Sequence, residues 1–341
     1  MAMSSYGSYK SHRRKTIVYY IIAAAVVAAA AILFFSSPSE NKTNQKASPV
    51  QPADTAGHMQ LEKETTIDRG ETQKSPSFRN VVAEANGLTD PRVMALLKEA
   101  QRDIDGGKFI GARDSLNDVL NMAMDANLRE QVKKQMSSLA NEWLFSRTVH
   151  FGDNFCSTYK VQPGDKLVNI ATKYKVPYQF LMKINNIRSE KSLQAGQVIK
   201  TVHGPFHAIV YRSSFTMDLY LQNIYVKSYK VGLGKEGHET PPGLWRAQIG
   251  GKLIKPTWTD PETGKTYHAN DPDYPLGSGW IRLEGIDSRT RGIEGIAFHG
   301  TKDESTIGTK SSSGCIRLYN GELVELYDMF EPGQSELRVV D

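Results

Sequence analysis

The spacing of apolar residues changes several times along the chain, and each spacing predicts a different element. Residues 17–35 form an apolar run of 19 residues without a charge, Gly or Pro. A helix of this length spans roughly 28 Å, close to the ~30 Å hydrocarbon thickness of a bilayer. A cleaved signal peptide is the alternative, but the run ends in bulky Phe34 and Phe35 instead of small residues. We therefore expect residues 16–35 to be an uncleaved membrane anchor.

The next two segments differ in apolar content. Residues 36–77 contain no aromatic residue and are rich in Ser, Thr, Pro and Gln, a composition that cannot offset the entropy of ordering. This predicts a disordered linker over residues 36–78. From about 79 to 150, apolar residues recur every three or four positions, which predicts three helices, the first capped by Asp90 and Pro91. With its Lys108-Phe109-x-x-Ala112 turn, this segment resembles one tetratricopeptide-like hairpin plus a helix, and is either a spacer or a docking surface for another protein.

Residues 157–203 alternate between strand and helix patterns. A short strand at 158–161 is followed by a turn at Gly164 and Asp165 and by two short helices separated at Pro177. A closing strand at 197–202 completes a small α+β unit of the form βααβ.

Residues 206–341 are rich in strand patterns. Apolar or alternating runs at 208–211, 217–221 and 225–231 predict strands, with a hairpin turn at Gln222 and Asn223. Residues 320–330 form the clearest helix pattern. The expected fold class is therefore multidomain: a membrane helix, a small all-α segment, an α+β unit and a mostly-β domain.

The charge distribution adds topology to this picture. The chain carries 42 Lys and Arg against 37 Asp and Glu, a net charge of +5. Four of these charges lie within residues 1–15, which contain no acid, so the remaining chain has a net charge of +1. The positive-inside rule places this tip in the cytoplasm and the rest of the chain outside the membrane. A nearly neutral folded part also disfavours nucleic acid as a partner.

Two cysteines cannot form a disulfide scaffold, but one of them has the setting of a nucleophile. Cys315 follows a Ser- and Gly-rich turn, and His299 ends an apolar run at 293–298, 16 residues upstream. A thiol needs a neighbouring base to become a thiolate. Backbone N–H groups around Gly314 and Cys315 could stabilise an oxyanion. The alternative is a buried structural cysteine near an unrelated histidine.

Within residues 157–203, the turn, both helix faces and the last strand match one known module. The matching residues are Tyr159, Val161, Gly164, Asp165, Leu167, Ile170, Ala171, Asn185, Asn186, Ile187, Leu193, Gly196, Gln197 and Ile199. The segment thus resembles the LysM family, which binds N-acetylglucosamine-containing glycans such as peptidoglycan. The resemblance implies a glycan groove formed by Gly164, Asp165, Lys166, Leu167, Asn186, Ile187 and Arg188. Turn formation and helix capping are the alternative roles of Gly164 and Asp165.

The C-terminal segment carries six short motifs: Gly232-Leu233-Gly234, Thr240-Pro241-Pro242-Gly243, Pro275-Leu276-Gly277-x-x-Trp280, His299-Gly300-Thr301, Ile307-Gly308 and Ser312-x-Gly314-Cys315-Ile316-Arg317-Leu318. Together they resemble the YkuD family of L,D-transpeptidases over essentially all of 206–341. The resemblance implies a β-sandwich-like catalytic domain in which Cys315 is the nucleophile, His299 the base and then the acid, and the Gly300 carbonyl orients the imidazole. Gly314, Ser313, Arg317 and Trp280 are expected at the oxyanion or substrate site. Ser313 departs from the family pattern, because many members have a second histidine there.

This resemblance implies 3→3 cross-linking of tetrapeptide stems through a thioester. The alternatives are an L,D-carboxypeptidase that uses water as acceptor, or a non-catalytic anchor that only binds peptidoglycan. His203 and His207 flank Gly204 and Pro205, which do not continue a helix, so we expect no metal site and no cofactor. We also expect Cys156 to be buried or distant from Cys315, because a disulfide between them would block the nucleophile.

Overall fold

The structure is a computed structural model that describes residues 78–85 and 90–341. The described residues belong to one compact unit. The predicted membrane anchor at 16–35 lies outside them, as does the predicted linker except for Phe78. Among the described helices, none is long and apolar enough to cross a membrane.

The helical segment contains α2 (Phe78–Glu84), α3 (Pro91–Asp105), α4 (Phe109–Leu120) and α5 (Ala126–Trp143). The three predicted helices are present, and α2 precedes them. Asp90 begins α3 as expected, since its carboxylate accepts the Arg92 N–H at 2.8 Å and Pro91 takes the first helical position. Asp125 caps α5 in the same way, by accepting the Leu128 N–H at 2.9 Å.

The next segment has the predicted βααβ order: β1 (Cys156–Lys160), α6 (Leu167–Tyr174), α7 (Tyr178–Ile184) and β2 (Val198–Val202), with the 3₁₀ turn η1 (Glu190–Ser192) before β2. Strands β1 and β2 pair antiparallel, with Cys156 opposite Val202. The apolar faces of both helices are buried, including Leu167, Phe180 and Leu181.

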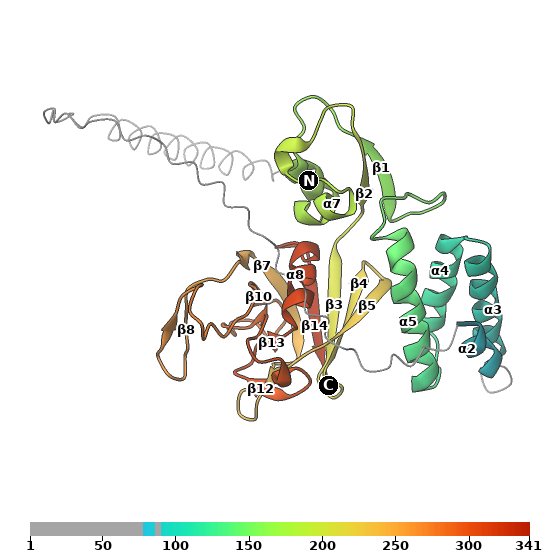
Figure 1. Ribbon diagram of the computed structural model, residues 1–341. Coiled ribbons are helices and arrows are strands. Elements are labelled where there is room, and N and C mark those ends of the chain that lie inside the picture. The colour runs from blue at the N-terminus through green and yellow to red at the C-terminus, as the bar shows by residue number, and fades with distance from the viewer. Residues whose placement is uncertain (1–77, 86–89) are drawn as a thin grey trace, which may run out of the picture. The chain divides into compact units, whose positions relative to one another are not determined.

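The C-terminal domain consists of β3 (Phe206–Tyr211), β4 (Thr216–Leu221), β5 (Ile224–Lys230), β6 (Leu233–Gly234), β7 (Gly243–Leu253), β8 (Trp258–Thr259), β9 (Thr266–Tyr267), β10 (Trp280–Gly285), β11 (Ala297–His299), η2 (Glu304–Thr306), β12 (Lys310–Ser312), β13 (Ile316–Arg317), α8 (Asn320–Met329) and β14 (Glu336–Val340). The predicted hairpin turn and the predicted last helix are present (Figure 1). The predicted strand at 293–298 is shorter, because it is regular only from Ala297 to His299.

The expected β-sandwich is replaced by one large mixed sheet. Eight strands pair in the order β13-β11-β10-β7-β14-β3-β4-β5, and β6-β12 and β8-β9 form two-stranded ribbons beside it. The difference arises because the last strand, β14, lies between β3 and β7, pairing parallel with the former and antiparallel with the latter. One strand thereby joins what would otherwise be two sheets. Helix α8 packs near β11, where Phe298 meets Phe330 at a ring distance of 5.5 Å.

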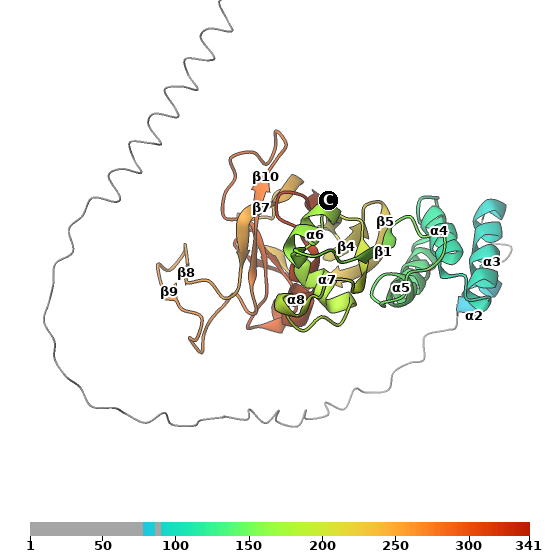
Figure 2. The ribbon, with the colours of Figure 1, turned by 90° about the horizontal axis from the view of Figure 1, so that it is seen from above.

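Strand β5 ends this sheet, and the helical segment packs against it (Figures 1 and 2). The Asn117 side chain of α4 accepts the backbone N–H of Tyr225 at 3.1 Å. Lys133 of α5 forms an ion pair of 2.7 Å with Asp218 of β4, whose side chain is 1% exposed. The helical segment therefore contacts the chain's own mostly-β domain.

A buried ion pair joins the helical segment to the loop that precedes β1. Arg113 of α4 contacts the Asp153 carboxylate at 2.8 Å, and their side chains are 1% and 0% exposed. The guanidinium also lies over the rings of Trp143 and Phe155, 4.6 and 4.9 Å from their centroids. The Arg113 guanidinium thus makes an ion pair, a hydrogen bond and cation–π contacts at this junction.

Lys200 of β2 also connects the βααβ segment to the end of α5. Its ammonium donates to the carbonyls of Trp143, Ser146 and Thr148 at 2.6, 3.0 and 2.9 Å, at the C-terminal end of α5. Burial lowers the pKa of Lys200, although nearby groups oppose this shift. The neighbouring Cys156 is a free thiol, 3% exposed, whose pKa burial raises to about 12. The expectation that Cys156 is buried is therefore confirmed.

Candidate active site

The loop that carries Cys315 is held by hydroxyl groups. Ser312 Oγ donates to the Cys315 carbonyl at 2.6 Å and accepts the Gly314 N–H at 3.2 Å. Thr240 Oγ1 donates to the Gly314 carbonyl at 2.9 Å. Gly314 has φ 111°, a conformation that favours glycine. Since the Gly314 N–H is engaged by Ser312, only the Cys315 N–H of the two expected oxyanion donors has no hydrogen-bond partner within the described residues.

The thiol of Cys315 is partly exposed and faces an aromatic cluster. It donates to the Gly295 carbonyl at 3.1 Å. Tyr274 and Trp280 of the cluster are buried, whereas Trp258 and Tyr267 are half-buried. Desolvation raises the pKa of Cys315 to about 11, against the opposing effects of the Ala297 N–H and of the Arg317 charge. The free thiol is therefore neutral at pH 7.

His299 is buried, with 4% of its surface exposed. Its Nδ1 lies 2.6 Å from the Gly300 carbonyl oxygen, as the family resemblance implied. A carbonyl only accepts, so Nδ1 carries the proton and Nε2 presents its lone pair. Burial and, to a lesser degree, the Arg317 charge lower the pKa of His299 to about 4, against the opposing effect of the Gly300 contact. The ring also stacks on Trp280, with centroids 5.7 Å apart.

Parallel pairing of β11 with β13 brings the two residues to neighbouring strands. Phe298 lies opposite Ile316, and His299 lies opposite Arg317. Cys315 is two residues before Arg317 in the sequence. Opposite residues of paired strands share a face of a sheet, so Arg317 and His299 lie on one side. Cys315 directly precedes β13. Within the described residues, no hydrogen bond joins the thiol to the imidazole, because the thiol is bonded to Gly295.

Arg317 braces the loop, one of the two roles expected for it. Its Nη1 donates to Ser311 Oγ at 3.1 Å, and its backbone N–H donates to the Gly232 carbonyl at 2.8 Å. Its Nε is buried without a hydrogen-bond partner. Burial lowers the pKa of the guanidinium, which stays charged at neutral pH.

Sequence reasoning missed Asn320, the first residue of α8. Its Oδ1 accepts the N–H groups of Ser278 and Thr301 at 3.0 and 3.2 Å, and its Nδ2 donates to the Thr301 carbonyl at 2.8 Å. A Cβ added at Gly277 or Gly300 would collide with Oδ1. Asn320 therefore holds the segment after His299 in place. The glycines of the two motifs were the available signal, since they mark a close approach.

The hairpin of β8 and β9 reaches the cysteine loop. Trp258 and Tyr267 stack across it at 6.1 Å. At its turn, Glu262 accepts from Ser313 Oγ at 2.7 Å and from the Lys235 ammonium at 2.7 and 2.9 Å. The Lys235 N–H donates in turn to the Ser312 carbonyl at 2.8 Å. Ser313 thus links the hairpin to the loop of the nucleophile.

We expect Glu262→Gln to increase the alkylation rate of Cys315 by iodoacetamide about two- to fivefold, because the change loosens the hairpin from the cysteine loop. The increase is small because an exposed ion pair contributes little to stability. The effect should shrink at high salt. Asp273→Asn is the matched control, because Asp273 pairs at 3.8 Å with Lys265 and Lys302 instead of with the loop. Equal rates for wild type and Glu262→Gln at low salt would contradict a holding role for this contact.

The expected glycan groove has both exposed and buried members. Gly164, Lys166, Asn186 and Arg188 are exposed, whereas Leu167 and Ile187 are 1% and 8% exposed and belong to the core. The Asp165 carboxylate accepts from the Tyr159 hydroxyl and the Gln162 N–H, both at 2.8 Å. Asp165 therefore stabilises the turn, and of the exposed four, Lys166, Asn186 and Arg188 have side chains on the surface.

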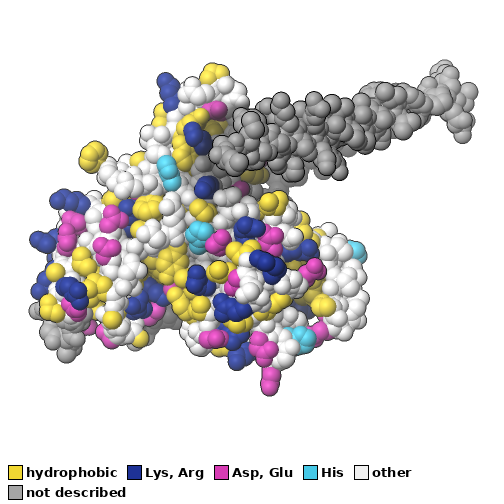
Figure 3. All heavy atoms as spheres, turned by 180° about the vertical axis from the view of Figure 1, so that it is seen from behind, with side chains coloured by type: hydrophobic (Ala, Val, Ile, Leu, Met, Phe, Trp, Pro, Cys, Tyr) yellow, Lys and Arg dark blue, Asp and Glu magenta, His cyan; other side chains and the backbone are white. Residues whose placement is uncertain are grey.

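The charged surface groups and the histidines outside the active site bear on the expectations of no polyanionic partner and no metal site. On the face shown in Figure 3, basic and acidic side chains are interspersed. Within the described residues, no cluster of three or more His, Cys, Asp or Glu could hold a metal ion. His203 contacts Ser157 Oγ at 3.0 Å, and His207 Nδ1 accepts the Glu336 N–H at 3.1 Å.

Comparisons with known families match the two C-terminal segments. The model of the L,D-transpeptidase catalytic domain, YkuD, matches residues 205–340. The LysM domain model matches residues 159–201.

Individual relatives agree with the family models. The Bacillus subtilis protein YkuD, which carries the L,D-transpeptidase name, is 28% identical over 52% of this chain and 94% of its own length. YqjB of the same organism, with the same family name, is 32% identical over 39% of this chain and 71% of its own length.

Solved structures of L,D-transpeptidases are also similar. One from Mycobacterium smegmatis is 16% identical, with a TM-score of 0.32, and the match covers 43% of this chain and 64% of the solved chain. The catalytic domain of the E. faecium L,D-transpeptidase is 19% identical, with a TM-score of 0.30, and the match covers 39% and 95%.

Proposed function

Because this chain belongs to the YkuD family of L,D-transpeptidases and carries a LysM domain, we propose that it is a cysteine acyltransferase that forms 3→3 cross-links in peptidoglycan. Cys315 is the nucleophile and His299 the base. The observation that supports the proposal is the parallel pairing of β11 with β13, because His299 lies opposite Arg317, two residues after Cys315. A structural cysteine next to an unrelated histidine would not require these two motifs to meet on neighbouring strands.

The protonation states decide how the nucleophile forms. With a pKa of about 11 for the Cys315 thiol and about 4 for the His299 imidazole, transfer of the proton between them is unfavourable in the free enzyme. Both groups are neutral at pH 7, so the thiolate forms only when substrate reorganises the site. The thiol then leaves the Gly295 carbonyl and gives its proton to His299 Nε2.

Acylation follows from these positions. Sγ of Cys315 attacks the carbonyl carbon of the third, L-centred residue of a tetrapeptide stem, while the Cys315 N–H stabilises the oxyanion. The C–N bond to the terminal D-alanine breaks, and His299 returns the proton to the departing amine. A thioester and free D-alanine result. Trp280 keeps the imidazole in place by stacking on it.

The acceptor decides the product. His299 takes a proton from the amine of a neighbouring stem, which attacks the thioester carbonyl carbon. The C–S bond breaks as the 3→3 amide bond forms, and His299 returns the proton to the Cys315 sulfur. Water in place of the amine would give an L,D-carboxypeptidase. In this proposal LysM holds the enzyme at the glycan strands through Lys166, Asn186 and Arg188, and residues 16–35 hold it on the outer face of a bacterial plasma membrane.

The test is to incubate the full chain with tetrapeptide muropeptides, with and without an acceptor stem. We expect release of D-alanine, a Cys315-bound adduct by mass spectrometry, and cross-linked dimers when the acceptor is present. D-alanine release without dimers would support the carboxypeptidase instead. Absence of both release and adduct would favour a non-catalytic peptidoglycan anchor.

The neutral resting state predicts a steep pH dependence of Cys315 alkylation. The thiolate fraction should rise about tenfold per pH unit between pH 7 and about 10, because the pKa is near 11. Iodoacetamide rates on the substrate-free enzyme measure this directly. A rate that is already flat from pH 6 to 8 would show a preformed thiolate–imidazolium pair and would overturn the neutral resting state.

A further inference from the structure

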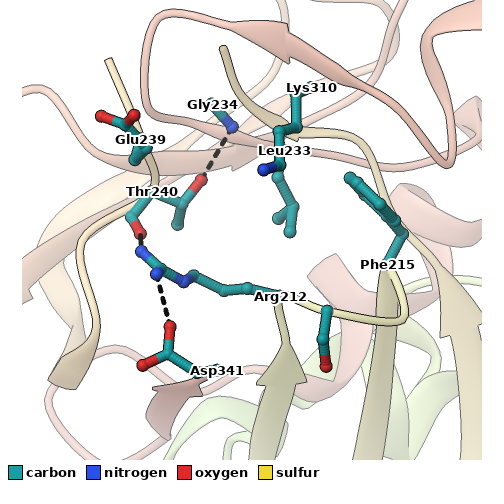
Figure 4. Close-up of a pocket in the computed structure, with 9 residues that line it drawn as sticks. Arg212, Phe215, Leu233, Gly234, Glu239, Thr240, Lys310 and Asp341 are labelled. Atoms are coloured by element: carbon teal, nitrogen blue, oxygen red, sulfur yellow. Dashed lines mark hydrogen bonds and ion pairs between the residues drawn. The ribbon is translucent and has the colours of Figure 1, made fainter. Parts of the chain in front are cut away.

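A cavity lies beside strands β6 and β12, and none of the proposed catalytic side chains lines it. It has a volume of about 280 Å³, below the usual 300–1,000 Å³ of sites for drug-sized ligands. Its walls come from the end of β3, from β6, from the loop before β7 and from β12. Figure 4 shows Arg212 crossing it toward Thr240 and Asp341, with Phe215 and Leu233 on the other side.

The lining combines two positive and two negative side chains: Arg212, Lys310, Glu239 and Asp341. Arg212 donates to the Thr240 carbonyl at 3.0 Å and pairs with Asp341, but its Nε is buried without a partner. Within the described residues, neither Lys310 nor Glu239 forms an ion pair with another side chain, and both are exposed. The Glu239 carboxylate accepts the Gly237 N–H at 3.1 Å. One buried donor, one exposed cation and one exposed acid therefore border the same space.

We propose that this cavity binds a small zwitterion, an amino acid or dipeptide with one carboxylate and one ammonium group. The carboxylate would lie between Lys310 and the Nε of Arg212, and the ammonium near Glu239. Leu233, 3% exposed, and half-buried Phe215 supply an apolar wall for a short side chain. An anion alone would place negative charge beside Glu239, and a cation alone would place positive charge beside Lys310 and Arg212.

The cavity is connected to the nucleophile loop by hydrogen bonds. Thr240 accepts from Arg212 through its carbonyl, accepts the Gly234 N–H at 3.0 Å through its hydroxyl, and donates that hydroxyl to the Gly314 carbonyl. A carboxylate that draws Arg212 away from Thr240 would shift the residue that precedes Cys315. Occupancy of the cavity is thus expected to change the reactivity of the thiol.

Binding is tested by calorimetric titration of the full chain carrying Cys315→Ala, which removes turnover, so that failure of the proposed chemistry and failure of this site give separate results. D-Alanine and D-alanyl-D-alanine are the probes and distinguish an amino acid from a dipeptide. N-Acetyl-D-alanine lacks the ammonium and D-alaninamide lacks the carboxylate. We expect at least one of the two zwitterions to bind, and both blocked compounds to bind at least about fivefold more weakly.

Lys310→Gln and Glu239→Gln should each weaken binding at least about fivefold. Both side chains are exposed, so the fold should tolerate the changes, and thermal unfolding verifies this. Lys302→Gln is the matched control, because Lys302 pairs with Asp273 outside the cavity. Absence of zwitterion binding, equal binding of the blocked compounds, or equal affinity in the two cavity variants would overturn the proposal. On the wild-type chain, the zwitterion that binds should also change the iodoacetamide rate of Cys315.

Discussion

Cys315→Ala should abolish D-alanine release from tetrapeptide muropeptides, with a loss of at least about 10³-fold. Sγ is the only atom of the loop that can form the thioester, and the neighbouring hydroxyls are already engaged in hydrogen bonds. Ser312 Oγ binds the Cys315 carbonyl, and Ser313 Oγ binds Glu262. The measurement is the rate of D-alanine release, combined with mass spectrometry of the intact protein.

Cys156→Ala is the matched control for this prediction. Cys156 is buried between β1 and the end of α5, where its thiol contacts the Trp143 carbonyl at 3.6 Å. Its pKa of about 12 keeps it neutral and unreactive. The variant should keep full activity per folded molecule and lose only some stability. Equal D-alanine release by wild type and Cys315→Ala would refute the cysteine mechanism.

Arg113→Met should lower the free energy of unfolding of the helical segment by about 3–5 kcal/mol. Methionine fills much of the volume but leaves the Asp153 carboxylate, 0% exposed, without its counter-charge. The second carboxylate oxygen of Asp153 is already buried without a partner, and the Phe155 N–H that donates to the first oxygen at 2.9 Å does not replace the lost charge. Urea unfolding followed by far-UV circular dichroism, which helices dominate, measures the change.

Adding Asp153→Asn to Arg113→Met should recover much of this loss, because it removes the stranded charge while its side-chain oxygen can still accept the Phe155 N–H. Arg92→Met is the matched control, since Arg92 pairs with Asp90 on the surface with its side chain 80% exposed. That variant should leave the unfolding transition unchanged. An effect of Arg113→Met no larger than that of Arg92→Met would contradict a stabilising role for the buried pair.

Periodic patterns and short motifs were sufficient to predict most elements and to single out His299 and Cys315 as the candidate catalytic pair. Helix stripes, caps such as Asp90, and the His299 and Cys315 motifs are local in sequence, so a single chain reveals them. The single large sheet was not predictable in the same way, because β14 pairs with β3 across more than 120 residues of sequence. Strand order depends on long-range packing, and no local pattern encodes it.

The same limit applies to the candidate site. The bond from Glu262 to Ser313 joins residues 51 apart, and that from Asn320 to Thr301 joins residues 19 apart. The Cys315 thiol is neutral because desolvation raises its pKa. The sequence alone did not show that Cys315 packs against the cluster of Tyr274 and Trp280. The family pattern placed Leu167 and Ile187 at the glycan groove, whereas both side chains are buried in the core.

The Asn117 contact with Tyr225 has a consequence for how this enzyme can be produced and trimmed. An exposed terminal strand offers unpaired N–H and C=O groups to any other strand, which invites aggregation. Here α4 and α5 cover β5, and a side-chain amide occupies one of its backbone groups. A fragment that begins at the LysM domain would lose this cover and expose a ready template for intermolecular sheet growth. The helical segment therefore protects the catalytic domain's solubility as well as adding length to the chain.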